Sequence, residues 1–271
     1  MNKTLLAATT LLAVNSLAQA GISVSSPAFS YSQSFDALTT ATAAQPWANN
    51  STLAGWSLFV SNGNAAPTLL GGTGSSNAGS FFSFGAAGVA ERALGSVASG
   101  GTYFGSPAAG AVAGYFALAF TNDSGGALAA FSLGFDGEQW RDGGAATPVA
   151  QTLVMEHGFG ASFAGVTSWQ SPGNSFNFTS PVLTNTASGA AVNGNVAGLV
   201  TGLGGNVAVG WMPGETLWLR WVEVNNAGND HGLAIDNLSF SFSVTAVPEP
   251  GTVALWLAGL GAIGFVARRR G

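Results

Sequence analysis

A two-residue hydrophobic period recurs in short stretches along the chain and points to one fold class. Residues 238–244 place Leu, Phe, Phe and Val on one face and serines on the other, which predicts a half-buried β-strand. Residues 131–136 and 116–120 repeat this alternation. The stretch 216–224 is apolar on both faces and is therefore predicted to be a central strand. Together these stretches predict an all-β fold.

The segments between these strands favour a sandwich. Further strands are predicted at 153–157, 176–178, 81–84 and 53–60. The ranges 71–79 and 184–205 are rich in Gly, Ser and Asn and are predicted to be loops, the second with room for one strand. No convincing amphipathic helix lies between residues 21 and 247. We therefore predict an antiparallel β-sandwich of the jelly-roll kind.

Charge is scarce in this chain. Only 7% of the 271 residues are charged, the formal net charge is −5, and glycine accounts for 40 residues. With 7 Lys and Arg residues, the chain lacks the cations that phosphate neutralisation requires, which excludes nucleic acid as a partner. There is no cysteine, so disulfide frameworks and thiolate metal sites are excluded as well. A hydrophobic core must therefore supply the stability.

Residues 1–20 have the three parts of a secretory signal peptide. Lys3 supplies the positive charge, residues 5–17 form a short apolar stretch, and Ala18-Gln19-Ala20 is a small-x-small cleavage site. We predict that this signal helix is removed on export and that the mature chain begins near Gly21.

The C-terminus carries three consecutive features. Pro248-Glu249-Pro250 is predicted to be extended and exposed, because proline lacks a backbone donor and has a fixed φ. Residues 252–267 are uncharged and apolar, and Arg268-Arg269-Arg270 follows directly. A helix over 252–267 would span roughly 24 Å at about 1.5 Å per residue, which approaches a bilayer core. The arginines would hold its end in the cytoplasm.

This order of features resembles the PEP-CTERM sorting signal of Gram-negative bacteria. The resemblance implies that exosortase, a membrane protease, cuts the exported chain at or near Pro248-Glu249-Pro250 and releases or re-anchors it. The chain would be an inner-membrane intermediate before it reaches the cell surface or the extracellular space. A plain tail anchor is the alternative. The predicted division is a signal peptide at 1–20, an ectodomain at 21–247 and a sorting signal at 248–271, with its transmembrane helix at 252–267.

A second resemblance covers residues 91–244. The motifs that carry it are Arg-Ala-Leu-Gly-Ser at 92–96, Gly-Glu-Gln-Trp-Arg at 137–141, Leu-Arg-Trp at 219–221 and Asp-His-Gly-Leu-Ala-Ile-Asp at 230–236. They are similar to an uncharacterised jelly-roll-like ectodomain that recurs in PEP-CTERM proteins and implies no activity. The last motif is also similar to the final strand of lectin-like jelly rolls.

The charged residues of these motifs allow two interpretations. Buried ion pairs that set the register of a sheet are typical near strand ends, and here they would involve Glu138, Arg141, Arg220 and Asp236. Alternatively, Asp230, Asp236 and Glu138 are candidate ligands of a structural cation, since Ca²⁺ prefers such oxygen donors. No spaced calcium motif supports the second interpretation, so no cofactor is predicted and Ca²⁺ remains the candidate metal.

Catalysis has little support in the sequence. No serine lies in a Gly-x-Ser-x-Gly motif, and His157 and His231 are the only histidines, too few for a zinc site unless carboxylates complete it. A glycoside-acting site would need two carboxylates, with Glu138 and either Asp236 or Glu223 as candidates. We predict that the protein is not an enzyme.

Trp218 and Arg220 share one face of the strand at 216–224, and Leu219 and Trp221 share the other. On an open face, the indole would stack on a sugar ring and the guanidinium would bind its hydroxyls. In a core, the same pair would be a buried Trp beside a paired Arg. The predicted function is a structural or adhesive role at the cell surface or in the extracellular matrix. A carbohydrate-binding module for exopolysaccharide is the alternative, and a glycoside-acting enzyme is the third candidate.

Overall fold

The computed structural model describes residues 21–26, 28–99 and 101–244. Sheet A contains six strands: β1 (Ile22–Val24), β4 (Trp56–Val60), β8 (Val112–Asn122), β10 (Thr152–Phe159), β11 (Phe178–Thr179) and β14 (Thr216–Val224). Sheet B contains nine: β2 (Ser30–Gln33), β3 (Gln45–Pro46), β5 (Thr68–Gly72), β6 (Ser80–Phe84), β7 (Ala93–Val97), β9 (Leu128–Asp142), β12 (Ala190–Ala191), β13 (Leu199–Trp211) and β15 (Gly232–Val244). Three 3₁₀ helices occur in the connections: η1 (Thr102–Phe104), η2 (Phe163–Gly165) and η3 (Asn174–Phe176).

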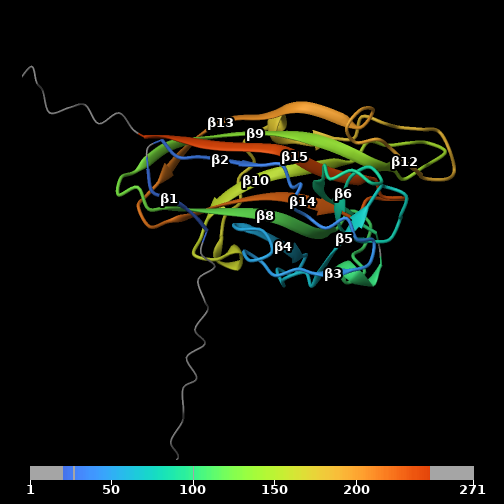
Figure 1. The fold of residues 1–271 in the computed structure, drawn as a ribbon, viewed down its shortest axis with the longest axis horizontal. Coiled ribbons are helices and arrows are strands. Elements are labelled where there is room, and N and C mark those ends of the chain that lie inside the picture. The colour runs from blue at the N-terminus through green and yellow to red at the C-terminus, as the bar shows by residue number, and fades with distance from the viewer. Residues whose placement is uncertain (1–20, 27, 100, 245–271) are drawn as a thin grey trace, which may run out of the picture.

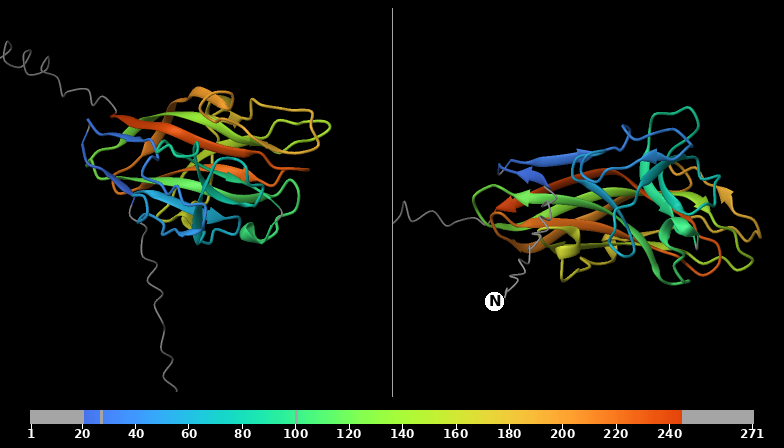
Figure 2. Two further views of the ribbon diagram at one scale, coloured as in Figure 1. Left: turned by 45° about the vertical axis from the view of Figure 1, so that its right-hand side comes forward. Right: turned by 90° about the horizontal axis from the view of Figure 1, so that it is seen from below.

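The two sheets pack face to face as a sandwich. Figure 1 shows β9, β13 and β15 in one layer and β8 and β14 in the other, and Figure 2 gives two further views of this arrangement. Aromatic rings join the inner faces. Phe120 of β8 stacks on Phe240 of β15 with ring centroids 3.9 Å apart, and Trp221 of β14 meets Phe135 of β9 edge-on at 5.5 Å. The all-β class and the sandwich are confirmed.

Most strand pairs are antiparallel. Sheet A has the order β1-β8-β14-β10-β11 with β4 beside β8, and sheet B has the order β12-β9-β15-β7-β6-β5-β3 with β13 beside β9 and β2 beside β15. Among the described strands, β1–β8 and β5–β6 are parallel pairs, so the predicted sandwich is not purely antiparallel. The successive strands β8, β9 and β10 alternate between the sheets, as do β13, β14 and β15.

Strand β14 coincides with the predicted central strand, whereas β15 begins at Gly232 rather than at residue 238. The predicted strand starts too late because a bulge at Asn237 interrupts the alternation of apolar and polar residues. Asn237 has a φ of 49° and lies in a register shift between Asp236 and Ser239. Because a bulge adds one residue, the hydrophobic phase changes across it. Ile235 and Leu238 both enter the core, which leaves Asp236 on the outer face of sheet B.

Strand β9 continues beyond the predicted strand at 131–136, through the motif at 137–141, and ends at Asp142. Residues on both faces of its second half are buried. The outer face is covered because Phe82, Phe84 and Trp140 form a second hydrophobic cluster there, with Phe84 stacked on Trp140 at 6.2 Å. The polar side chains at 138–142 are therefore buried within the strand itself.

Some segments differ from their predictions. The predicted loop at 184–205 contains β12 and the first half of β13. The predicted strand at 176–178 is the end of η3 followed by the short β11. Strands β1, β2, β3, β5 and β7 were not predicted, and all of them have five residues or fewer. Such short strands rarely contain enough residues to show a period.

In the described part of the chain, no helix is long and apolar enough to cross a bilayer. The signal helix at 1–20, the transmembrane helix at 252–267 and the sorting residues around them lie outside the described residues.

Candidate functional site

Trp218 lies on the outer face of sheet A, but its side chain has no exposed surface. The segment that contains η2 folds over this face. Phe163 of that segment packs edge-on against Trp218 with centroids 5.8 Å apart, and the Trp218 indole N–H donates to the Gly160 carbonyl at 3.0 Å. The open-face alternative, in which the indole stacks on a sugar, therefore does not describe Trp218, because the η2 segment covers the strand. The core alternative describes Trp218 correctly.

Arg220 occupies the border of this aromatic cluster. Its guanidinium lies over the rings of Trp169 and Tyr115, at 3.9 and 4.6 Å from their centroids. It also pairs with Glu156, directly opposite on β10, with Nη2 2.5 Å and Nε 2.7 Å from Oε2. The Arg220 side chain is 14% exposed and the Glu156 side chain is 23% exposed. The guanidinium is thus stacked and neutralised at the surface, and Trp169 and Tyr115 are the half-buried rings beside it.

Sequence reasoning missed the partners of Arg220. Tyr115 comes from β8, Glu156 from β10 and Trp169 from a loop. Nothing in the linear spacing connects these residues, because the register of β14 places Tyr115 and Glu156 beside Arg220, and the pairing of Gln170 with His157 brings the Trp169 loop to β10.

A carboxylate cluster lies on the outer face of sheet B. It contains Glu138 of β9, Asp236 of β15 and Glu91 of the segment before β7, and one carboxylate oxygen of each lies within 4.8 Å of the others. Glu138 and Asp236 are only 1% and 3% exposed. Sequence reasoning proposed Glu138 and Asp236 as ligands and missed Glu91.

Burial governs the protonation of this cluster. It raises the pKa of Glu138 to about 7 and that of Asp236 to about 8. The Trp140 indole N–H, 2.7 Å from Glu138 Oε2, acts in the opposite direction. Glu91 raises both pKa values further through its negative charge. The pair that was proposed for glycoside hydrolysis, Glu138 and Asp236, is thus close together but too deeply buried for a sugar chain to reach.

Asp230 does not join this cluster. Its Oδ1 accepts the backbone N–H of Asn226 at 2.7 Å, and burial raises its pKa to about 7. Its charged neighbour is Glu223, whose Oε2 accepts the Ser96 hydroxyl at 2.6 Å. Burial raises the pKa of Glu223 well above its usual range. The predicted ligand set of Asp230, Asp236 and Glu138 is therefore wrong in one member, because Asp230 lies before β15 and faces Glu223.

The two histidines lie in different environments. His231 Nε2 is 3.4 Å from Asp142 Oδ1 in a buried pair, and Asp142 Oδ2 also accepts from the backbone N–H and the hydroxyl of Thr184. His157, on β10, meets the ring of Phe131 edge-on at 5.5 Å in the core. Burial lowers the pKa of both histidines. Within the described residues, neither belongs to a group of potential metal ligands.

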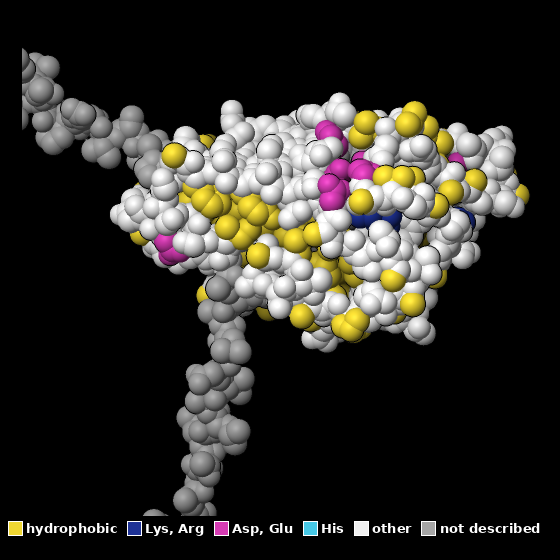
Figure 3. Space-filling view, viewed as in Figure 1, with side chains coloured by type: hydrophobic (Ala, Val, Ile, Leu, Met, Phe, Trp, Pro, Cys, Tyr) yellow, Lys and Arg dark blue, Asp and Glu magenta, His cyan; other side chains and the backbone are white. Residues whose placement is uncertain are grey.

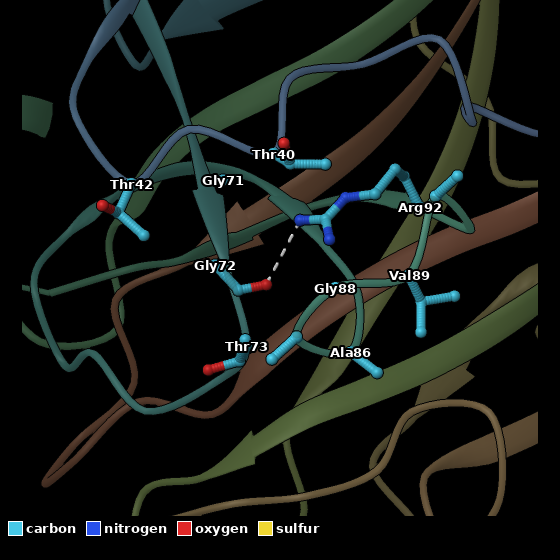
Figure 4. Close-up of a pocket in the computed structure, with 11 residues that line it drawn as sticks. Thr40, Thr42, Gly71, Gly72, Thr73, Ala86, Gly88, Val89 and Arg92 are labelled. Carbon is cyan, nitrogen blue, oxygen red and sulfur yellow. Dashed lines mark hydrogen bonds between the residues drawn. The ribbon is translucent and has the colours of Figure 1, made fainter.

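A cavity of about 500 Å³ lies beside Arg92. Its wall is mainly threonine, glycine and alanine, and Arg92 is the one charged residue that lines it. The guanidinium is held by hydrogen bonds from Nε to Ser83 Oγ at 2.9 Å and from Nη2 to the Gly72 carbonyl at 3.3 Å. Figure 4 shows the Arg92 side chain directed at that carbonyl. The cavity therefore presents a single positive charge among small side chains.

Two motifs of the second resemblance, at 137–141 and 230–236, meet across β9 and β15. Leu233 pairs with Gln139, and Ala234 pairs with Glu138. Gln139 fixes a neighbouring loop by accepting the Val182 N–H at 2.8 Å and donating to the Val182 carbonyl at 2.9 Å. These contacts indicate that the motif residues hold the middle of sheet B and the loops on it.

Comparisons with known proteins identify the C-terminal segment. The PEP-CTERM protein-sorting motif matches residues 246–270. This motif marks an exported protein that is anchored in the membrane and then processed by exosortase. No curated protein matches the chain.

Two solved structures show a loose likeness to the sandwich. The CBM22-1 xylan-binding domain of Xyn10C from Paenibacillus barcinonensis is 12% identical with a TM-score of 0.36, over 80% of this chain and 95% of that one. The CBM22-1–CBM22-2 tandem domain of the same protein is 13% identical with a TM-score of 0.35, over 79% of this chain and 49% of that one. At these TM-scores, neither likeness says what this chain binds.

Proposed function

We propose that the mature protein is a non-catalytic, structural or adhesive protein of the cell surface or extracellular matrix, delivered there by exosortase. The sorting motif at 246–270 is the observation that carries this proposal. The alternation of β8, β9 and β10 between the two sheets supports a jelly-roll ectodomain over 21–247. In this proposal the segment from residue 248 onward anchors the chain in the inner membrane until it is cut.

The test is the behaviour of cells that lack the protein. Loss of the chain should reduce the amount of matrix that cells retain after washing. The full chain should restore it, whereas a variant with Pro248, Glu249 and Pro250 replaced by alanine should stay in the membrane fraction and fail to restore it. Normal matrix retention in cells without the chain would reject a structural role, and rescue by the triple-alanine variant would reject its dependence on sorting.

A second candidate function is the binding of exopolysaccharide on the outer face of sheet A. It is favoured by the half-buried rings of Trp169 and Tyr115, which contact the guanidinium of the Arg220–Glu156 pair. Aromatic rings beside charged hydrogen-bonding groups suit the apolar face and the hydroxyls of a sugar. Trp169→Ala should then reduce polysaccharide retention in a pull-down, whereas Met212→Ala, which removes an exposed apolar side chain elsewhere, should not. Equal retention by both variants would reject this site.

A further inference from the structure

The carboxylate cluster of Glu91, Glu138 and Asp236 brings three acidic side chains together on the outer face of sheet B. Among the described residues, the ion pairs are Arg220–Glu156 and His231–Asp142, and neither involves the cluster. Arg92 follows Glu91 in the chain and interacts with it electrostatically, but the guanidinium donates its hydrogen bonds to Ser83 and Gly72. Figure 3 shows Asp and Glu side chains gathered in one group on this face, beside basic side chains. Buried carboxylates without a cation are unstable unless they are protonated or bind a metal.

Unsatisfied oxygens are the second observation. Asp236 is only 3% exposed, and its Oδ1 accepts no hydrogen bond from any described residue. Glu91 Oε1 is likewise buried and unpartnered within the described chain, while Glu91 Oε2 accepts from Asn195 Nδ2. An unsatisfied buried acceptor destabilises the folded state, because it loses its hydrogen bonds to water on folding. The unpartnered oxygens are therefore free to act as ligands of a cation.

The spacing and chemistry of the cluster suit a hard divalent cation. Calcium lies 2.3–2.6 Å from its oxygen ligands, so two oxygens on one ion are at most about 5 Å apart. The three carboxylate oxygens, all within 4.8 Å of one another, meet this limit. Zinc prefers nitrogen and sulfur ligands, and neither histidine lies in the cluster. Asp36, which is exposed and interacts electrostatically with Asp236, adds a fourth carboxylate on the same side.

We propose that Glu91, Glu138 and Asp236 bind one Ca²⁺ ion that fastens the segment before β7 to the β9–β15 pair. Bound there, the ion joins side chains from three separate parts of sheet B and its connections. The ion would stabilise the fold of the exported protein and would take part in no reaction. This proposal is independent of the sorting and of any polysaccharide binding.

Calcium binding by the purified full chain tests the proposal. Equilibrium dialysis with radioactive Ca²⁺ is expected to give one ion per chain. At a free concentration about a hundred times the dissociation constant, the ion should raise the melting temperature by roughly 5–11 °C, because it binds the native state alone. Asp236→Asn and Glu91→Gln should each weaken binding at least tenfold.

Glu223→Gln is the matched control, since it removes another buried carboxyl outside the cluster, and it should bind Ca²⁺ as the wild type does. Glu91 is the less buried ligand, so Glu91→Gln gives the decisive result if Asp236→Asn fails to fold. The absence of binding at 10 mM Ca²⁺, or unchanged binding by Glu91→Gln, would overturn the proposal and leave protons as the partners of these carboxylates.

Discussion

Replacing Trp218 by alanine is expected to destabilise the sandwich by roughly 3–5 kcal/mol, the usual cost of truncating a buried tryptophan. The side chain is fully buried between sheet A and the segment of η2, and its indole N–H satisfies the Gly160 carbonyl at 3.0 Å. The substitution removes the ring contact with Phe163 and leaves that carbonyl without its donor. For a domain of 150–250 residues, this cost corresponds to a fall in melting temperature of roughly 6–20 °C.

Equilibrium unfolding in urea measures this effect, with the midpoint and the slope fitted separately. Trp218→Phe is the first control, because it keeps a ring in the cluster and should cost less than alanine. Trp169→Ala is the second control, because Trp169 is only half-buried and should also cost less. A Trp218→Ala protein within about 1 kcal/mol of the wild type would show that the segment of η2 does not cover this face and would restore Trp218 as a candidate for binding sugars.

Three further predictions follow from individual contacts. Burial raises the pKa of Glu223, so the native state holds an extra proton at pH values between the unfolded and native pKa, and stability falls there as the pH rises. Glu223→Gln should therefore gain stability relative to the wild type between pH 5 and pH 8. Parallel pH profiles of the melting temperature for the two proteins would contradict this. Gly74→Ala should destabilise the protein by more than about 1 kcal/mol, because Gly74 has a φ of +79° and a Cβ there would lie 1.7 Å from the Trp140 carbonyl oxygen. A variant that unfolds in urea at the wild-type midpoint would refute this prediction. A double-mutant cycle of Glu156→Gln and Arg220→Met should give a coupling of about 1 kcal/mol, since the pair is partly exposed, and a coupling near zero would contradict its stabilising role.

Hydrophobic period predicted β8, β14 and parts of β9 and β15, with the sides on which their residues lie, but it missed β13, whose first half was predicted to be a loop. It located β14 at its observed bounds and assigned Trp218 and Arg220 to one face, with Trp221 on the other. Period cannot show whether a loop covers a face, and this is why the sequence left open whether Trp218 is exposed or lies in a core. In β15, the apolar residues change from odd positions before Asp236 to even positions after Asn237, and this shift of phase was a readable sign of the bulge.

The candidate site was less accessible from sequence because it depends on contacts between distant segments. Glu138 and Asp236 were chosen for their charge in an otherwise uncharged chain, and the β9–β15 pairing does bring them together. Glu91 was missed because it lies outside any strand and no spacing relates it to the other two. Asp230 was included because it shares a motif with Asp236, but the turn before β15 directs it toward Glu223.

The intact mass of the protein recovered from the cell surface tests most directly that this chain is exported and sorted by its C-terminal motif. The predicted mass is that of a chain that begins near Gly21 and ends close to Pro248-Glu249-Pro250, within the matched motif at 246–270. The same chain from cells without exosortase should retain the arginine cluster and remain in the membrane. A surface protein whose mass still includes Arg268, Arg269 and Arg270 and ends at Gly271 would contradict exosortase processing.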